Sequence, residues 1–277
     1  MKIIPLICIV VLFFSSLGVV QSINIKSINS DDFDPLVDIN VSFELLAIRS
    51  LDDIDNSESP DFFVKLIINE EEFTSDIWYD KKYVYEPDFT VTTNVPDDVE
   101  FVTIEILLYD WNSNTNYLCD IGDENKKAVL YYSIKNGHWT GDDKLEDKSG
   151  YGRLCGCDDG SIYENERDCE IFFDIYQNDY DNDKIPYWTE IKTYQTDPEY
   201  DNSGEDFDED DLPIEYEHKW GFNPLIFEDH KNIDYDVDSL NNYEEFLTSD
   251  FGTDPFRQDV MLEYDFMMAG PSNEDNI

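Results

Sequence analysis

Basic residues are scarce in this chain of 277 residues. It has 18 Lys and Arg against 65 Asp and Glu, so its formal net charge is −47. We therefore expect no nucleic-acid partner, because such binding needs Lys and Arg clustered against phosphates. A charge of this size favours disorder, but 41% hydrophobic and 15% aromatic residues indicate a packed core. Bound divalent cations would relieve the self-repulsion of the acidic groups.

Recognisable catalytic groups are also lacking. The chain has three histidines, His138, His218 and His230, and none of them forms an H-E-x-x-H pair or stands beside a Ser or Cys nucleophile pattern. A glycosidase needs two carboxylates in a cleft, but a pair drawn from 65 acids is uninformative. We predict that the chain is not an enzyme.

Long hydrophobic runs are absent after the N-terminus. Lys2 is followed by an apolar stretch over residues 3–20, and Val20-Gln21-Ser22 places small residues at the −3 and −1 positions of a cleavage site. This pattern predicts a signal peptide over residues 1–22 and a secreted or cell-surface protein. The alternative is an uncleaved N-terminal anchor, since the stretch is nearly long enough to span a membrane.

Cysteine is used sparingly but in an even number. Cys8 lies in the signal segment, and the mature chain keeps Cys119, Cys155, Cys157 and Cys169. In an oxidising compartment this number predicts disulfides. Cys155 and Cys157 are too close for a relaxed bridge. Two pairings stay open, Cys119–Cys155 with Cys157–Cys169, or Cys119–Cys157 with Cys155–Cys169. A zinc site is disfavoured because there is no second closely spaced pair.

The first part of the chain, residues 23–177, has the features of a β-structure. Short runs rich in β-branched and aromatic residues are separated by clusters of Asp, Asn, Pro and Gly, which is typical of an antiparallel sandwich. The Gly- and Asp-rich stretch over 137–160 is expected to be a long excursion held by the disulfides. The predicted strands cover residues 37–48, 62–68, 101–109, 129–134 and 170–176.

The C-terminal part contains three twelve-residue segments of one form. Each has Asp at positions 1, 3 and 5, an aliphatic residue at position 7 and Glu at position 12, which are the ligand positions of an EF-hand-type calcium loop. Chance gives four such acids in roughly 0.003 of windows, so a merely solvated acidic linker is disfavoured. The segments are Asp179–Glu190, Asp206–Glu217 and Asp234–Glu245.

A short helical stretch follows each loop and ends at an aromatic-x-x-[Asp/Asn]-Pro stop, at Pro198, Pro224 and Pro255. This array, residues 178–256, resembles thrombospondin type-3-like repeats and the dockerin half-EF-hand. The resemblance implies calcium as cofactor, with each unit too small to fold alone. The implied ligands are Asp179, Asp181, Asp183, the Ile185 carbonyl and Glu190; Asp206, Asp208, Asp210, the Leu212 carbonyl and Glu217; and Asp234, Asp236, Asp238, the Leu240 carbonyl, Asn242 and Glu245.

The loops depart from those families at position 6, where the families have Gly with a positive φ. Here the residues are Lys184, Asp211 and Ser239. Asp tolerates a positive φ better than a bulky Lys does. We therefore predict that the first loop binds calcium most weakly or opens to a less tight turn.

Two acidic loops of the sandwich resemble those of C-two (C2) domains, which bind calcium in many membrane-binding proteins. The matching residues are Asp55 and Asp61 in one loop and Asp110, Asn112 and Asp120 in another. The resemblance implies a second metal site there; the alternative is Asp-rich turns at strand ends. Membrane binding is not expected, because basic residues and exposed apolar loop tips are not evident.

The sequence thus predicts a multidomain protein: an antiparallel, C2-like β-sandwich followed by a small α-helical, calcium-stabilised loop–helix array. Residues 257–277 form a strand and polar tail that resemble the start of a further domain. The expected function is a secreted, non-catalytic calcium-binding protein for adhesion or surface scaffolding, with an extracellular protein or surface ligand. The alternatives are the non-catalytic N-terminal portion of a secreted hydrolase resembling metalloproteases, and calcium-dependent lipid binding through the sandwich.

Overall fold

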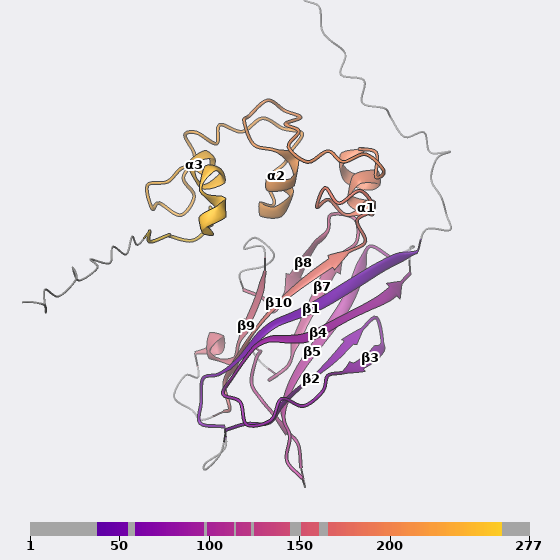
Figure 1. Ribbon diagram of the computed structural model, residues 1–277, viewed down its shortest axis with the longest axis vertical. Helices are drawn as coiled ribbons and strands as arrows, with labels where there is room; N and C mark the ends of the chain where they lie inside the picture. The colour runs from indigo at the N-terminus through magenta and orange to yellow at the C-terminus, as the bar shows by residue number, and fades with distance from the viewer. Residues whose placement is uncertain are drawn as a thin grey trace, which may run out of the picture.

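The strands between residues 39 and 177 form two β-sheets packed as a sandwich (Figure 1). The structure is a computed structural model and describes residues 38–54, 59–96, 99–113, 115–122, 125–144, 151–160 and 166–261. One sheet has the order β4-β1-β10-β9 and the other β3-β2-β5-β7-β8, with β6 paired to β5. The strands are β1 (Ile39–Ser50), β2 (Phe62–Ile68), β3 (Glu71–Thr74), β4 (Tyr83–Val95), β5 (Phe101–Asp110), β6 (Tyr117–Leu118), β7 (Ala128–Ser133), β8 (His138–Gly141), β9 (Gly152–Cys155) and β10 (Cys169–Gln177).

Side-chain alternation builds the core between the sheets. In β5, Val102, Ile104, Ile106 and Leu108 are fully buried, and the residues between them are exposed or half-buried. The other sheet contributes Phe43 and Phe173, whose rings stack with centroids 5.5 Å apart. All pairings between these strands are antiparallel, so the predicted antiparallel sandwich is confirmed.

Several strands lie where none was predicted. The stretch 137–160, expected to be a long excursion, contains β8 and β9, with the 3-10 helix η2 (Gly156–Asp159) after β9. β4 was missed because its alternation is broken: Glu86 and Asp88, on either side of Pro87, have φ of 46° and 53°. These residues form the irregularity opposite the bulge between Leu45 and Ala47 of β1.

The acidic segments after β10 carry short helices close to the predicted positions. They are α1 (Tyr187–Thr189), continued by the π-helix η3 (Glu190–Tyr194), then α2 (Ile214–Trp220), α3 (Asn242–Leu247) and the 3-10 helix η4 (Ser249–Phe251). Figure 1 shows α1 at the end of β10, with α2 and α3 following in chain order.

The aromatic residues of the three units are divided between two clusters. Tyr187 and Trp188 of the first unit belong to the sandwich core. The second and third units build a separate cluster from Leu212, Tyr216, Trp220 and Phe222, against which Tyr243, Phe246 and Phe256 pack. The first unit therefore docks on the sandwich, since α1 follows β10 closely and its rings complete that core.

Two predicted segments lie outside the described residues: the signal peptide, residues 1–22, and most of the C-terminal strand and tail, residues 262–277. Within the described part of the chain, no helix combines the length and apolarity needed to span a membrane.

Candidate metal centres

The three acidic loops share one backbone conformation. Their sixth residues, Lys184, Asp211 and Ser239, lie in the left-handed region with φ of 73°, 78° and 88°. The fourth residue of each loop also has a positive φ. The first loop therefore does not open to a less tight turn, and it adopts the same turn as the others despite its lysine.

The first aspartate of each loop holds this turn together. The carboxylate of Asp179 accepts hydrogen bonds from the backbone N–H groups of Asn182 at 2.8 Å and Lys184 at 2.9 Å. Asp206 and Asp234 accept the corresponding pair in their own loops. Aspartate is well suited to this position because its short side chain reaches backbone N–H groups two to five residues ahead.

The aspartate at position 5 of each loop bonds the chain that follows the helix of that loop. One carboxylate oxygen of Asp183 accepts from the N–H of Ile185 at 2.8 Å, and the other accepts from the N–H of Asn202 at 3.3 Å. Asp210 bonds the N–H of Leu212 and Glu228 in the same way, and Asp238 bonds those of Leu240 and Asp259. Each loop and the segment after its helix thus meet at one carboxylate.

The closing glutamates are buried without sufficient partners. Glu190, Glu217 and Glu245 are 0%, 0% and 1% exposed. Among the described residues, neither carboxylate oxygen of Glu217 or Glu245 has a hydrogen-bond partner, and one oxygen of Glu190 has none. Oxygens of the aspartates at position 3 (Asp181, Asp208, Asp236) are likewise buried and unpartnered. Burying an uncompensated carboxylate is strongly unfavourable, so these groups need a proton or a cation.

The pKa values express the same problem. Burial raises the pKa of Glu190 and Glu217 to about 9, and that of Glu245 to about 8. Like-charge repulsion by the aspartates of each loop contributes to these raised pKa values. Burial also raises the pKa of Asp183 and Asp208 to about 6.

The donor set fits a hard divalent cation. In each loop the carboxylates of the aspartates at positions 1, 3 and 5 offer oxygens within 4.8 Å of one another. Calcium takes six to eight such oxygens, and a buried glutamate can supply two. The carbonyls of Ile185, Leu212 and Leu240 stay predicted ligands. Asn242 also stays a predicted ligand: its amide nitrogen lies 3.0 Å from Nδ1 of His230, and its buried amide oxygen has no partner among the described residues.

His230 is the residue that the sequence analysis missed as a donor. Its Nε2 lies 3.1 Å from a carboxylate oxygen of Asp210, and the ring is fully buried. Aligning the sequences of the units would have singled out His230, because His230 and Asn202 each stand four residues before the next loop begins and only one of them is a histidine.

Of the described residues predicted as a second metal site in the sandwich, Asp61, Asp110 and Asn112 lie together, whereas Asp120 does not join them. Asp110 accepts hydrogen bonds from the N–H of Asp61 at 3.0 Å and from the side-chain amide of Asn112 at 3.1 Å. β6 turns the chain back along β5, which carries Asp120 along the strand and away from Asp110. Asp55 lies outside the described residues.

Asp120 instead joins Glu166 and Asp168. The ammonium group of Lys126 lies 3.5 Å from a carboxylate oxygen of Asp120 and donates to the Glu166 carbonyl at 2.7 Å. This lysine already supplies a positive charge to the cluster, so the cluster gives no clear reason for a metal ion.

Neither predicted disulfide pairing is present. Cys119, Cys155, Cys157 and Cys169 are all free thiols. Cys169 shares a hydrogen bond with Cys119, and Cys155 shares one with Cys157. Both predicted pairings are wrong because the chain around Asp120 runs beside that around Asp168, which makes Cys119 and Cys169 neighbours.

Comparison with known proteins gives structural likeness only. No family model and no curated protein sequence matches the chain. Similar solved structures include a C2 domain (11% identity, TM-score 0.33, covering 50% of this chain and 98% of that one) and a C2 domain of plant extended synaptotagmin 1 (14%, 0.33, 51% and 96%). Human GIVD cytosolic phospholipase A2 is also similar (14%, 0.34, 50%), but the chain spans only 16% of it. With TM-scores below 0.5, these likenesses carry no argument about the fold or the function of this chain.

The left-handed lysine leads to a first prediction. Lys184→Gly should raise the calcium affinity of the first loop by about tenfold, because a non-glycine residue in this region costs about 1–2 kcal/mol. Isothermal titration calorimetry measures the gain. Lys184→Ala is the matched control, since it removes the same charge but keeps the strained φ. Equal gains in both variants would assign the effect to charge, and no gain in Lys184→Gly would contradict the prediction.

The glutamates predict an unusual pH dependence for the metal-free protein. Their folded-state pKa values lie above the ordinary value of 4.5. Between about pH 5 and 9 the folded state therefore holds protons that the unfolded state has released, so its stability should fall as pH rises. Thermal melting of metal-free protein at several pH values tests this. Glu217→Gln should weaken the dependence, and a melting temperature that rises with pH would be the contrary result.

Proposed function

We propose that the chain is a calcium-binding protein in which three ions hold three loop–helix units together and onto a β-sandwich. One observation carries the proposal: Glu190, Glu217 and Glu245 are enclosed with carboxylate oxygens that have no partner among the described residues. A calcium ion in each loop would supply the missing positive charge and accept these oxygens as ligands.

The proposed role of the ions is structural and not catalytic. The aspartate at position 5 of each loop already accepts a hydrogen bond from the segment after the helix. An ion fixed by that aspartate and by the closing glutamate would therefore connect the loop, the helix and the following segment. Secretion and a role in surface adhesion or scaffolding are part of this proposal, supported by the signal-like N-terminus. The non-catalytic portion of a secreted hydrolase stays the alternative.

Metal counting tests the proposal. Native mass spectrometry of the full chain in millimolar calcium, the range in which extracellular modules commonly bind, should show three bound ions. Glu217→Gln should remove one ion, whereas the control Glu199→Gln, which removes the same charge at an exposed position, should keep three. Removing calcium should lower the melting temperature by mass action. Identical melting curves with and without calcium would refute the proposal.

A specific feature of the sandwich favours a second candidate, calcium-dependent lipid binding. Tyr79 is 57% exposed, and its ring meets that of Trp111 edge to face at 6.0 Å. Both residues lie beside Asp61, which accepts from the N–H of Asp80 through its side chain and from the N–H of Trp111 through its carbonyl. Such aromatic rings suit a membrane interface, and the exposure of Tyr79 is not evident from the sequence.

Liposome sedimentation tests this candidate. If it is correct, vesicles of phosphatidylserine and phosphatidylcholine should bind the chain in calcium and release it in chelator. Replacing both Tyr79 and Trp111 by Ala should reduce the bound fraction severalfold, because each buried aromatic ring contributes apolar area. Tyr200→Ala is a control with equal exposure on the array. Unchanged binding of the double variant would exclude this surface.

A further inference from the structure

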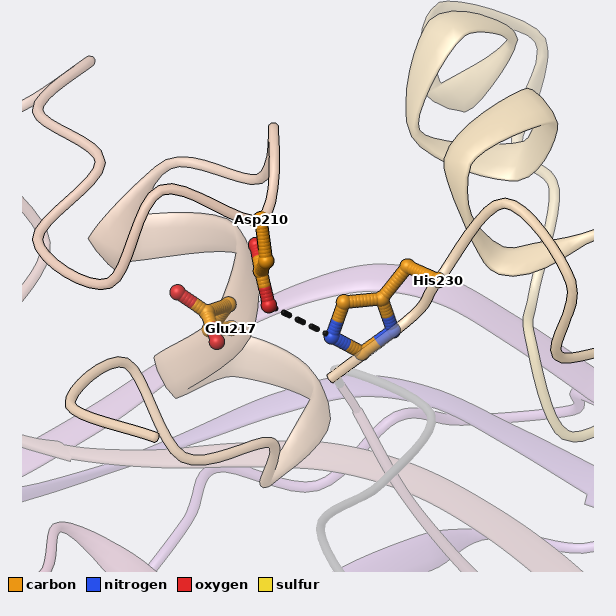
Figure 2. Close-up of side chains that lie close together, drawn as sticks. All are labelled: Asp210, Glu217 and His230. Atoms are coloured by element: carbon orange, nitrogen blue, oxygen red, sulfur yellow. Dashed lines mark ion pairs between the residues drawn. The ribbon is translucent and has the colours of Figure 1, made fainter. Parts of the chain in front are cut away.

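The second loop contains a donor that the other two lack. Figure 2 shows His230 directed toward Asp210, with Glu217 nearby on α2. One ligand atom of each of these residues lies within 4.8 Å of the others. All three are buried, with exposed fractions of 0% for His230, 3% for Asp210 and 0% for Glu217. They come from the loop, from the helix after it and from the segment leading to the third loop.

The short contact in this group is not a hydrogen bond. Nε2 of His230 lies 3.1 Å from Oδ2 of Asp210, yet this nitrogen has no hydrogen-bond partner among the described residues. The two carboxylate oxygens of Glu217 are also unpartnered. The ring nitrogen and the carboxylates converge, and no proton is aligned between them. They therefore form a suitable set of ligands for one cation.

The other ring nitrogen has a partner that can leave Nε2 free. Nδ1 of His230 lies 3.0 Å from the side-chain amide of Asn242, whose oxygen has no partner among the described residues. The nitrogen and oxygen of an amide exchange positions on a half-turn. With the oxygen facing the ring, Nδ1–H donates to it and Nε2 keeps its lone pair. Metal-bound histidines are commonly oriented by such a hydrogen bond from their second nitrogen.

The corresponding places in the other units hold no imidazole. Asn202 stands where His230 does, four residues before the next loop, and its N–H bonds Asp183. In the third unit the N–H of Asp259 bonds Asp238. The first and third loops therefore present oxygen ligands, whereas the second presents oxygen and nitrogen. Calcium prefers oxygen alone, and imidazole suits zinc and related transition metals.

We propose that the second loop is a mixed oxygen and nitrogen site that binds a transition metal of the zinc class through Nε2 of His230, Asp210 and Glu217. This inference rests on the proposed function in one respect: Asp210 and Glu217 also belong to the calcium loop, so the two metals compete there. Zinc would replace calcium in the second loop and leave the first and third loops unchanged. The chain would then respond to two metals at distinct positions.

Native mass spectrometry with Zn²⁺ as the probe tests the inference. In millimolar calcium, added zinc should convert the wild-type species with three calcium ions into one with two calcium ions and one zinc ion. His230→Asn gives the second unit the residue that the first unit has at the aligned position, Asn202. It should keep three calcium ions and lower zinc affinity by about tenfold or more. His138→Asn, a histidine outside the loops, is the control and should bind zinc as the wild type does.

A measurement on the wild-type chain does not depend on how the variant folds. Zinc should shift the Nε2 resonance of His230 in imidazole ¹H–¹⁵N correlation spectra. Zinc binding that is equal in His230→Asn and wild type, or that leaves this resonance unmoved, overturns the inference. If calcium fails to bind while zinc binds through His230, the inference stands and the calcium function fails; if calcium binds and zinc ignores His230, the reverse holds.

Discussion

Enclosed acidic side chains are the constraint on which the C-terminal half of the molecule depends. Glu190, Glu217 and Glu245 are inside the fold, and the aspartates that surround them add negative charge. Water cannot stabilise these groups there, so a proton or a cation must. The backbone of each loop is fixed by its left-handed residues and by the hydrogen bonds of the aspartates at positions 1 and 5. If the proposed cations bind, their binding and the folding of the units would be one process.

The sandwich and the array are joined unequally. Tyr187 and Trp188 complete the core of the sandwich, and the hydroxyl of Thr193 donates to the Lys135 carbonyl at 2.7 Å. The second unit contacts this first unit and the sandwich edge, where the ring of His218 packs on His138 and bonds Tyr194. Its main apolar contacts are with the third unit. The first unit therefore has apolar support independent of its loop, whereas the other two units draw most of their apolar contacts from each other.

Local patterns predicted more of this structure than distant ones. The strand of Val102 to Leu108 and the three loops follow from residues close in sequence, because alternation and ligand spacing are read along the chain. β8 and β9 were missed because few apolar residues mark them, and β4 because a bulge breaks its alternation. The separation of Asp110 from Asp120 and the proximity of Cys119 to Cys169 depend on how strands pair, which spacing alone does not specify. His230 escaped notice because it lies outside the twelve-residue loop pattern that marks the other ligands.

The separate aromatic cluster of the second and third units has a consequence for how the chain would be degraded. Without cations, the segments around that cluster would open, while α1 would stay held by Trp188 in the sandwich core. Proteases cut chains where the backbone opens. Cleavage would then begin after the first unit, beyond Gln195, and release the distal units from a persistent sandwich. The metal content of the surroundings would thus set the length of the surviving protein.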